Sequence, residues 1–308
     1  MNSQDVKNAI SGVLVVDKPV GMTSHDVVQV IRNGTNLRRA GHTGTLDPRA
    51  SGVLVILVGP AVRLSEYVSA SDKRYQAIIR LGARTDTFDA DGKVTQGNSP
   101  VNVTEAQFEE VLQTFIGEIE QTPPPYSAVK VQGRKAYEMA RKGEEVELEP
   151  RKITVHHLEV LEWAPPEVVI DVHCSSGTYV RSLANDLGEK LGCGAYLVGL
   201  RRTKSGRFSL RDAVPLRKLQ EAFHAGNWYQ YLIPAAEALA DWPAIELSPD
   251  EVEGVRHGHR VKAAEDVALG SRVRGVSTQG ELVALMEAVQ GEDGQPAWQP
   301  KKVFFTSE

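Results

Sequence analysis

The chain has 308 residues, of which 41% are hydrophobic and 24% are charged; this balance is typical of soluble globular proteins and excludes disorder as a description of the whole chain. Its two cysteines, Cys174 and Cys193, are too few for a disulfide framework and fit a reducing cytoplasm. The polar first residues do not resemble a secretory signal, and the longest apolar run, which begins at Val53, is too short to cross a bilayer, so we expect a cytoplasmic protein without a membrane partner.

Charge is distributed unevenly along the chain, whose formal net charge is −5. Residues 1–240 carry 28 basic and 28 acidic side chains, whereas residues 241–308 carry 7 basic and 12 acidic ones. Basic residues gather in the stretches 130–152 and 201–218. Clustered cations suit phosphate contacts, so a nucleic-acid partner is not excluded, although a solvated surface explains the same clusters equally well.

Periodicity and turn residues predict the elements of the first half of the chain. In chain order we expect a buried strand at 12–18 ended by Pro19, a helix over 24–31 and a glycine-rich loop over 38–51. A second buried strand is expected over 53–58. We also expect strands at 75–81 and from 94 joined through an Asp91-Gly92 hairpin, and a helix over 104–116 capped by Thr104.

The second half is predicted to contain more strands than helices. In chain order we expect strands near 154–160 and 168–174, a helix over 181–191 ended by Gly192, short strands at 197–202 and 206–210, a linker near Trp242, and strands at 271–276 and 282–286 around a turn at Gly280. Because helices and strands do not alternate as regular βαβ units, the fold class is expected to be α+β, with a small β-rich domain at the end.

Several chemistries find no support in the motifs. The glycine patterns of dinucleotide-binding folds and of P-loops are missing from the sequence. The acidic stretch 86–92 is a poor match to a calcium loop because Asn98 stands where the twelfth ligand should be glutamate, and a hairpin turn explains it better. His156-His157 and His257-Gly-His259 lack a cysteine or carboxylate at zinc spacing, which favours surface histidines. We therefore predict no metal site.

The loop that holds Asp47 is chemically more suggestive. A carboxylate before a proline is often only a turn residue, and that interpretation stays open for the loop on its own. Glycines on both sides of Asp47, including Gly44 and Gly52, would let a substrate approach the backbone closely. His42 is a flat ring that can stack against a base. Asp47 is therefore a candidate nucleophile.

Three distant residues could complete a site around Asp47. Arg181 would keep the carboxylate ionised and oriented, as a nucleophilic aspartate requires. Tyr75 and Tyr179 could stack on a pyrimidine and offer hydroxyl contacts. Packing in the core explains each of these residues when it is considered singly, and sequence spacing alone does not bring them together.

Four blocks of the chain resemble the TruB family of tRNA pseudouridine synthases in order and spacing. They are Asp17-Lys-Pro-Val-Gly-Met-Thr-Ser24, Gly41-His-Thr-Gly-Thr-Leu-Asp-Pro-Arg-Ala-Ser-Gly52, the stretch 73–92 that contains Lys-Arg-Tyr75 and Thr-Asp-Thr-Phe-Asp-Ala-Asp-Gly92, and Gly177-Thr-Tyr-Val-Arg-Ser-Leu-Ala-Asn-Asp-Leu-Gly188. The resemblance covers about residues 12–215. The remaining tail is similar, with a weaker signature, to a PUA-type RNA-binding domain.

The resemblance implies the domain organisation. Residues 1–240 would form a pseudouridine-synthase catalytic domain with a central mixed, mainly antiparallel sheet flanked by helices and loops. Residues 123–152 would form an RNA-binding thumb inserted in that domain, and residues 241–308 a PUA-like RNA-binding domain.

The resemblance also implies roles for single residues. Asp47 would be the catalytic aspartate, Arg181 its partner, and Tyr179 the residue beside the reacting ring. The residues expected to bind the substrate are Tyr75 stacked on the target base, His42 in the space that the base leaves, Leu200 in the pocket wall, and Lys18, Tyr126 and Lys130. Ser176 departs from the lysine that many relatives carry, which would remove one phosphate contact.

By the same resemblance, the chain would isomerise uridine to pseudouridine at position 55 in the T-loop of tRNA, by base flipping and without a cofactor, and could also assist tRNA folding. We expect a monomer that contacts the T-arm, and the acceptor end through its last domain, and that requires no protein partner. Two alternatives stay open: a guide-RNA-dependent pseudouridine synthase acting on ribosomal RNA, and an RNA-binding protein or tRNA-folding chaperone without required catalysis.

Overall fold

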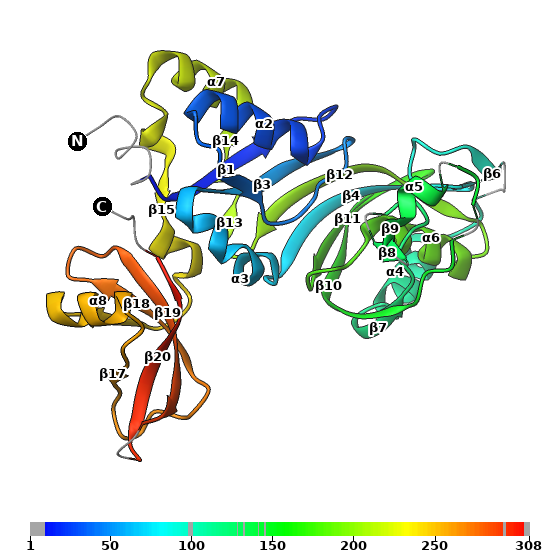
Figure 1. Ribbon diagram of the computed structural model, residues 1–308. Helices are drawn as coiled ribbons and strands as arrows, with labels where there is room; N and C mark the ends of the chain where they lie inside the picture. The colour runs from blue at the N-terminus through cyan, green and yellow to red at the C-terminus, as the bar shows by residue number, and fades with distance from the viewer. Residues whose placement is uncertain are drawn as a thin grey trace. The chain divides into compact units, whose positions relative to one another are not determined.

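The computed structural model describes residues 10–97, 101–127, 129–131, 133–140, 142–144, 146–291 and 294–304. The chain divides into two compact units (Figure 1): unit 1 contains residues 1–48, 53–69 and 207–308, and unit 2 contains residues 49–52 and 70–206. Both units combine helices with sheets in which consecutive strands are mostly not joined as βαβ repeats. The predicted α+β class is therefore confirmed.

The first sheet of unit 1 is organised around β1 (Gly12–Lys18). This strand pairs in parallel with β14 (Val214–Pro215) and antiparallel with β15 (Ile233–Pro234), and it neighbours β3 (Ala50–Val58). The apolar residues of β1 and β3 are buried almost without interruption, which is the pattern of strands covered on both faces. Both strands were predicted from their unbroken apolar runs.

The loop predicted over residues 38–51 contains a short strand that the glycine content concealed. Residues Ala40–His42 form β2 and pair antiparallel with residues 56–58 of β3. Gly41 pairs with Leu57 of the buried strand. The part of the segment that carries Asp47 therefore connects two paired strands.

Two helices of unit 1 pack against each other. Helix α2 (Ser24–Thr35) begins after Thr23, whose side chain forms a capping box with Asp26. Helix α7 (Leu216–Ala225), which the sequence did not predict, lies beside it (Figure 1). The shorter helical segments of unit 1 are 59–64, α3 (Ser65–Ser69), 228–231 and 235–239.

The last part of unit 1 has a sheet of its own. Its strand order is β16-β18-β19-β20-β17, with the bounds Ala244–Leu247, Arg272–Ser277, Leu282–Gln290, Pro296–Val303 and Val261–Lys262. Helix α8 (Pro249–Arg256) packs on this sheet, and a separate apolar cluster that includes Val255, Met286 and Trp298 fills the space between them. The predicted strands around Gly280 are confirmed.

The sheet of unit 2 runs in the order β12-β4-β11-β10-β7, with the first residues of β3 beside β12. The bounds of these strands are Ala195–Ser205, Lys73–Leu81, Glu167–Cys174, Arg151–Ala164 and Gly117–Gln121. All pairs are antiparallel except β3 with β12, so the predicted mixed, mainly antiparallel sheet is confirmed. Helices α4 (Glu105–Gln113) and α6 (Val180–Lys190) pack on β10 and β12, respectively.

Two strand predictions in unit 2 were wrong in their pairing or length. Strand β4 pairs with β11 and β12 rather than with the strand after residue 94. That strand, β6 (Val94–Gln96), pairs with β5 (Arg84–Thr85) in a separate hairpin closed by the Asp91-Gly92 turn. Residues 197–202 belong to the longer β12, which continues past Gly199 with a register shift between Leu197 and Gly199.

The predicted thumb, residues 123–152, contains three short elements. They are β8 (Lys130–Val131), β9 (Arg134–Lys135) and α5 (Ala136–Ala140). Residues 128, 132, 141 and 145 of this stretch lie outside the described residues. The limits of the thumb and the domain boundary after residue 240 stay predictions.

Candidate active site

The loop that carries Asp47 is fixed by hydrogen bonds on its N-terminal side. The Ser24 hydroxyl, at the start of α2, accepts the Leu46 N–H at 2.8 Å and donates to the Leu46 carbonyl at 3.0 Å. The Thr43 N–H donates to the Val55 carbonyl at 3.1 Å. The backbone immediately before Asp47 is therefore held against a helix start and a central strand, while the Asp47 side chain is half-buried.

A buried lysine holds the other side of the same loop. Lys18 is fully buried, and its ammonium donates to the carbonyls of Pro19 at 2.9 Å and Met22 at 2.6 Å, with Pro48 at 3.5 Å. The Gly21 N–H donates to the Pro48 carbonyl at 2.8 Å. These contacts give Lys18 a structural role in positioning the loop; its predicted contact with substrate stays a prediction.

Gly41 and Gly52, on either side of the loop, differ in the free space around them. Gly52 has φ +97°, and a Cβ there would lie 2.2 Å from the Arg202 carbonyl oxygen. The space at Gly52 is thus filled by β12, which corrects the expectation that a substrate approaches the backbone there. A Cβ at Gly41 would meet no atom within 4 Å. His42, at the end of β2, is half-buried beside it.

The predicted catalytic residues of unit 2 lie at the start of α6. Tyr179 is the N-cap residue of that helix, and its backbone is clamped by the buried side chain of Gln121. The Tyr179 N–H donates to Gln121 Oε1 at 2.8 Å, and Gln121 Nε2 donates to the Tyr179 carbonyl at 3.1 Å. This amide replaces the side-chain cap that Tyr179 cannot supply, and it fixes where α6 begins.

Arg181 is buried in the first turn of the same helix and reaches two other segments. Its Nη2 donates to the Tyr126 carbonyl at 3.1 Å, and its Nη1 lies 3.4 Å from both the Thr87 carbonyl and Asp89 Oδ2. The guanidinium therefore links α6 to the acidic hairpin turn and to the base of the predicted thumb. Tyr126 takes part through its backbone, a contact that side-chain chemistry did not predict.

The acidic residues of the hairpin serve the turn. Asp86 Oδ1 accepts the Lys93 N–H at 2.8 Å, and Asp89 Oδ1 accepts the Asp91 N–H at 3.0 Å. Asp91 also forms an ion pair with Arg49. The interpretation of stretch 86–92 as a hairpin turn is confirmed.

Tyr75 and Leu200 lie on adjacent strands of unit 2. Leu200 pairs with Ala77 of β4 on one side and with Ala50 of β3 on the other, and Tyr75 pairs with Arg202. Because paired residues share a face and side chains alternate along a strand, Tyr75 and Leu200 are on one face of the sheet. The structure thus brings these two predicted residues together.

Two groups near Tyr75, Lys73 and Cys174, have shifted pKa values. Lys73 lies two residues earlier on the same strand face, and burial together with the charge of Arg202 lowers the pKa of Lys73 to about 8. Its strand partner Cys174 is buried, and the loss of hydration raises the pKa of that thiol to about 11. Cys174 is therefore an inert thiol near neutral pH.

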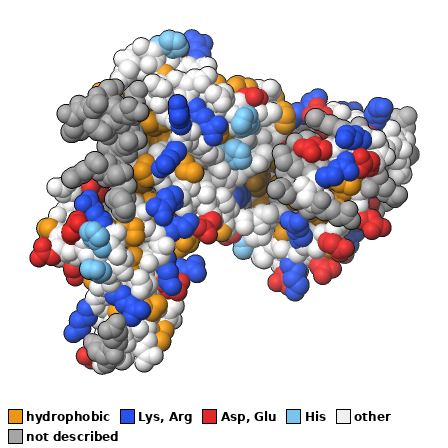
Figure 2. Space-filling model, viewed as in Figure 1, with side chains coloured by type: hydrophobic (Ala, Val, Ile, Leu, Met, Phe, Trp, Pro, Cys, Tyr) orange, Lys and Arg blue, Asp and Glu red, His pale blue; other side chains and the backbone are white. Residues whose placement is uncertain are grey.

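Not all residues of the basic stretches are available to RNA. Arg202 is 2% exposed and belongs to the core of unit 2. Arg207 forms an ion pair with Glu237, whereas Lys204, Arg211 and Lys218 are exposed. Figure 2 shows Lys and Arg side chains on the visible face of the molecule, with acidic side chains between them. The Lys130 side chain lies outside what the structure describes.

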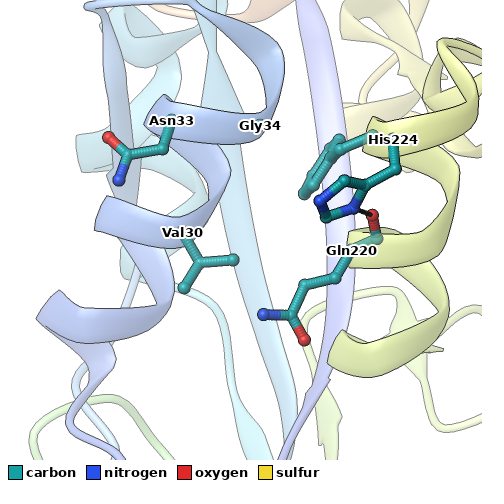
Figure 3. Close-up of a pocket in the computed structure, with 6 residues that line it drawn as sticks. Val30, Asn33, Gly34, Gln220 and His224 are labelled. Atoms are coloured by element: carbon teal, nitrogen blue, oxygen red, sulfur yellow. Dashed lines mark hydrogen bonds between the residues drawn. The ribbon is translucent and has the colours of Figure 1, made fainter.

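A pocket in unit 1 holds none of the predicted site residues. It lies between α2 and α7 (Figure 3), and its walls are Val30, Asn33, Gly34, Gln220, Phe223 and His224. His224 Nδ1 is 2.7 Å from the Gln220 carbonyl, within one turn of α7. The pocket is therefore separate from the loop that carries Asp47.

Sequence reasoning missed several residues that shape the site. Gln121 stands in none of the family-like blocks, so only its folded contacts reveal it, whereas Ser24 ends the first block without having been assigned a role. Asp89 stood in one of the family-like blocks, and that block was the available signal. The predicted residues themselves fall into two groups: Lys18, His42 and Asp47 belong to unit 1, and Tyr75, Tyr126, Tyr179, Arg181 and Leu200 belong to unit 2. In the described part of the chain, helices are all too short or too polar to span a membrane.

Comparison with known proteins agrees with these features. Residues 32–180 match the model of the TruB family pseudouridylate synthase N-terminal domain, and residues 181–240 match that of the tRNA pseudouridylate synthase B C-terminal domain. A tRNA pseudouridine synthase B of Pseudomonas fluorescens strain Pf-5 is 43% identical over 296 residues, covering 95% of each chain.

Two solved structures are also similar. A chain of a Cbf5-Nop10-Gar1 complex has a TM-score of 0.75 at 29% identity, with 98% of this chain and 87% of that chain covered. A chain of an H/ACA RNP bound to a substrate RNA containing 2′-deoxyuridine has a TM-score of 0.73 at 27% identity, with coverages of 98% and 86%. The chain therefore belongs to the TruB family of tRNA pseudouridylate synthases, enzymes that isomerise uridine in tRNA.

Proposed function

We propose that this enzyme converts the T-loop uridine of tRNA, position 55 in tRNA convention, to pseudouridine with Asp47 as its essential group and without a cofactor. The family membership supports the reaction, and the name shared by its relatives supports tRNA as the substrate. The observation that carries the assignment of Asp47 is the rigid loop around it, held by Ser24 on one side and by Lys18 and Gly21 on the other.

The reaction is an isomerisation, so no external group or electron is consumed. The N1–C1′ bond of the uridine breaks, the base rotates, a C5–C1′ bond forms, and the proton on C5 leaves. A uridine in a folded loop must first be flipped out, which costs a few kcal/mol. Stacking on Tyr75 would return about 1–3 kcal/mol, and His42 would occupy the space left in the RNA.

Asp47 acts in its ionised form in this proposal. It adds to the base or the ribose, or it removes a ribose proton, and either Tyr179 or Asp47 then accepts the C5 proton. Arg181 is assigned to keep Asp47 ionised and oriented, because a neighbouring guanidinium favours a carboxylate. The contacts of Arg181 with Tyr126, Thr87 and Asp89 support this role, since they give the guanidinium a fixed orientation within unit 2.

We assign the RNA contacts to the basic stretches and to the thumb, with Tyr126 and Lys130 near its base and Leu200 in the pocket wall. The T-arm is recognised by shape and phosphates. Residues 241–308, with 7 basic and 12 acidic side chains, provide a secondary contact near the acceptor end. The enzyme works as a monomer in the cytoplasm, needs no protein partner, and assists tRNA folding while bound.

The test is tritium release from tRNA labelled at C5 of uridine. The wild type should release tritium, whereas Asp47→Asn should abolish release while its affinity for tRNA stays nearly unchanged, because the amide keeps the shape but not the charge. Asp212→Asn, which changes an exposed turn aspartate, is the matched control and should retain wild-type turnover. Wild-type turnover by Asp47→Asn would refute the assignment.

The similarity to H/ACA complexes makes a guide-RNA-dependent activity on ribosomal RNA the second candidate. The tritium-release assay on an isolated T-arm without guide RNA distinguishes these two candidates. Tritium release from it shows that no guide is required, and release only with a guide RNA would favour the second candidate. A chain that binds tRNA but releases no tritium from any RNA would be an RNA-binding or folding protein.

A further inference from the structure

Two histidines and one aspartate from three separate segments meet in unit 2, away from the residues assigned to catalysis. Asp72 ends the loop before β4, His156 lies on β10 and His173 on β11. His156 Nε2 is 3.2 Å from Asp72 Oδ2, and His173 Nε2 is 3.9 Å from the same oxygen. One donor atom from each residue can be chosen so that all three lie within 4.8 Å of one another.

An irregularity in the sheet brings His156 into this cluster. Val155 pairs with Cys174 and His157 pairs with His173, so His156 is the extra residue of a β-bulge. A bulge turns one side chain out of the regular alternation and is common beside functional sites. The result is two imidazole rings whose centroids are 4.9 Å apart, each with its Nε2 within 4 Å of the same Asp72 oxygen. Sequence reasoning could not find this carboxylate, because Asp72 is far from both histidines in the chain.

We propose that Asp72, His156 and His173 bind one Zn²⁺ ion, with water in the fourth position. Zinc bonds to imidazole nitrogen and carboxylate oxygen at about 2.0–2.2 Å in a tetrahedron, so its donor atoms lie roughly 3.4 Å apart. The distances of 3.2 and 3.9 Å to Asp72 are close to that separation. Magnesium and calcium prefer oxygen ligands, whereas a set of two imidazoles and one carboxylate suits zinc.

The surroundings permit an ion to enter and bind. The three side chains are 36–49% exposed, so they can rotate to shorten the remaining donor distance. The cations near the cluster are Arg74 and Lys204. Arg74 itself is paired with Asp171 at 2.8 Å, which compensates much of its charge.

The same geometry decides against the histidines as a phosphate site. Binding of an RNA phosphate would require protonated rings, yet the Asp72 carboxylate lies within 4 Å of both rings and would repel a second anion. A zinc ion instead neutralises the carboxylate and connects the loop before β4 to β10 and β11. Bound zinc should therefore stabilise unit 2, because any ligand specific to the folded state raises the melting temperature.

The test is zinc binding by the untagged full-length protein after treatment with a chelator, measured by calorimetry and by the visible absorption of Co²⁺ as a substitute. The wild type should take up one ion at this site, with the absorption of a four-coordinate centre. His173→Ala and Asp72→Asn should weaken binding by at least roughly 10- to 100-fold, since even residues outside the ligand sphere have effects of that size. Zinc should raise the melting temperature of the wild type and not that of the two variants.

Two controls make the result specific. His157→Ala alters the neighbouring exposed histidine, which is near Glu159 instead of Asp72, and should bind zinc as the wild type does. The double variant His257→Ala/His259→Ala removes the other close histidine pair and should also bind normally. The proposal is overturned if the wild type takes up no zinc or if His173→Ala binds like the controls. It is also overturned if the cluster variants lose tRNA affinity in the absence of any metal, because the histidines would then serve RNA.

Discussion

At the scale of single residues, buried cations organise the segments around the proposed site. Lys18, Lys73, Arg181 and Arg202 are at most 8% exposed. Lysine and arginine are rarely buried unless polar partners surround them. Lys18 and Arg181 meet that condition largely through backbone carbonyls of loops, so each fixes a loop that no regular hydrogen-bond ladder holds. A basic side chain in this chain can therefore stabilise the fold without contacting RNA.

Lys73 gives a pH dependence whose sign can be worked out. Its pKa is about 8 in the folded state, mainly because of burial, and 10.5 is the ordinary value. Between these values the unfolded state binds more protons, so the free energy of unfolding rises with pH in this window and is lowest, for this group, below about pH 8. Lys73→Met should remove that rise.

Urea unfolding of the wild type and of Lys73→Met across the window measures the effect. The difference in stability between the two proteins should change steadily with pH in favour of the wild type. Lys262→Met, which changes an exposed lysine, should track the wild type throughout. A pH-independent difference for Lys73→Met would contradict the shifted pKa.

At the scale of elements, helix propensity and side-chain packing act in opposite directions where α2 contacts α7. A Cβ on Gly34 would lie 2.1 Å from the Phe223 ring (Figure 3 shows Gly34 facing α7). Alanine in place of glycine within a helix gains about 1 kcal/mol of propensity. Overpacking typically costs about 1–3 kcal/mol. At so short a distance the packing term should win, and Gly34→Ala should destabilise the protein by roughly 1–2 kcal/mol.

Chemical denaturation checks this prediction through a double-mutant cycle. With Phe223→Ala in the background, the clash disappears and Gly34→Ala should become neutral or stabilising. His25→Ala, at an exposed position of the same helix, is the control for propensity. If Gly34→Ala stabilises the unmodified protein, the ring moves aside at little cost and the packing argument is wrong.

The elements that neighbouring residues signal clearly were predicted from the sequence. The apolar runs of β1 and β3, the capping residue Thr104 of α4 and the strands around Gly280 all follow from neighbouring residues. Helix α7 was missed although Leu216, Leu219 and Ala222 are spaced for one buried face.

Long-range pairing and the site needed more than local patterns. The partners of β4 lie about a hundred residues away, and periodicity contains no information on them. The same is true of Asp72 with His156, and of Gln121 with Tyr179. Residue chemistry made Asp47, Arg181, Tyr75 and Tyr179 candidates, only the family-like blocks joined them into one site, and their catalytic roles stay predictions. The loop geometry explains how Asp47 is held, which the sequence could not do.

At the scale of the whole molecule, the last 68 residues are tied into unit 1 and do not form a loosely attached module. Arg274 donates to the carbonyls of Ala236 at 2.8 Å and Trp242 at 3.1 Å, and Arg63 donates to the Val303 carbonyl at 2.6 Å. Leu282, Leu285 and Phe304 belong to the same apolar cluster as residues of β1 and β3. Removal of residues 241–308 therefore uncovers part of that core.

We expect the truncated protein to melt at least roughly 10 °C below the full chain, because burial of each large apolar side chain contributes about 1.5–3 kcal/mol. Its affinity for tRNA should fall, while tritium release by the molecules that remain folded continues at low temperature. Thermal denaturation followed by the labelled-tRNA assay measures both. An unchanged melting temperature would contradict the shared core, and loss of chemistry in a folded truncation would contradict the assignment of catalysis to the first 240 residues.

The position of β1 also sets an order for folding during synthesis. Its neighbour β3 is made early, but its other partners, β14 and β15, begin at residues 214 and 233, so the pairing of the strand is complete only when about three quarters of the chain has been made. At about 5–20 residues per second, that delay is roughly 10–40 s. Unit 2 ends at residue 206 and can fold within this interval. The apolar run of β1, which lacks its β14 and β15 partners meanwhile, is the segment on which we expect ribosome-associated chaperones to act.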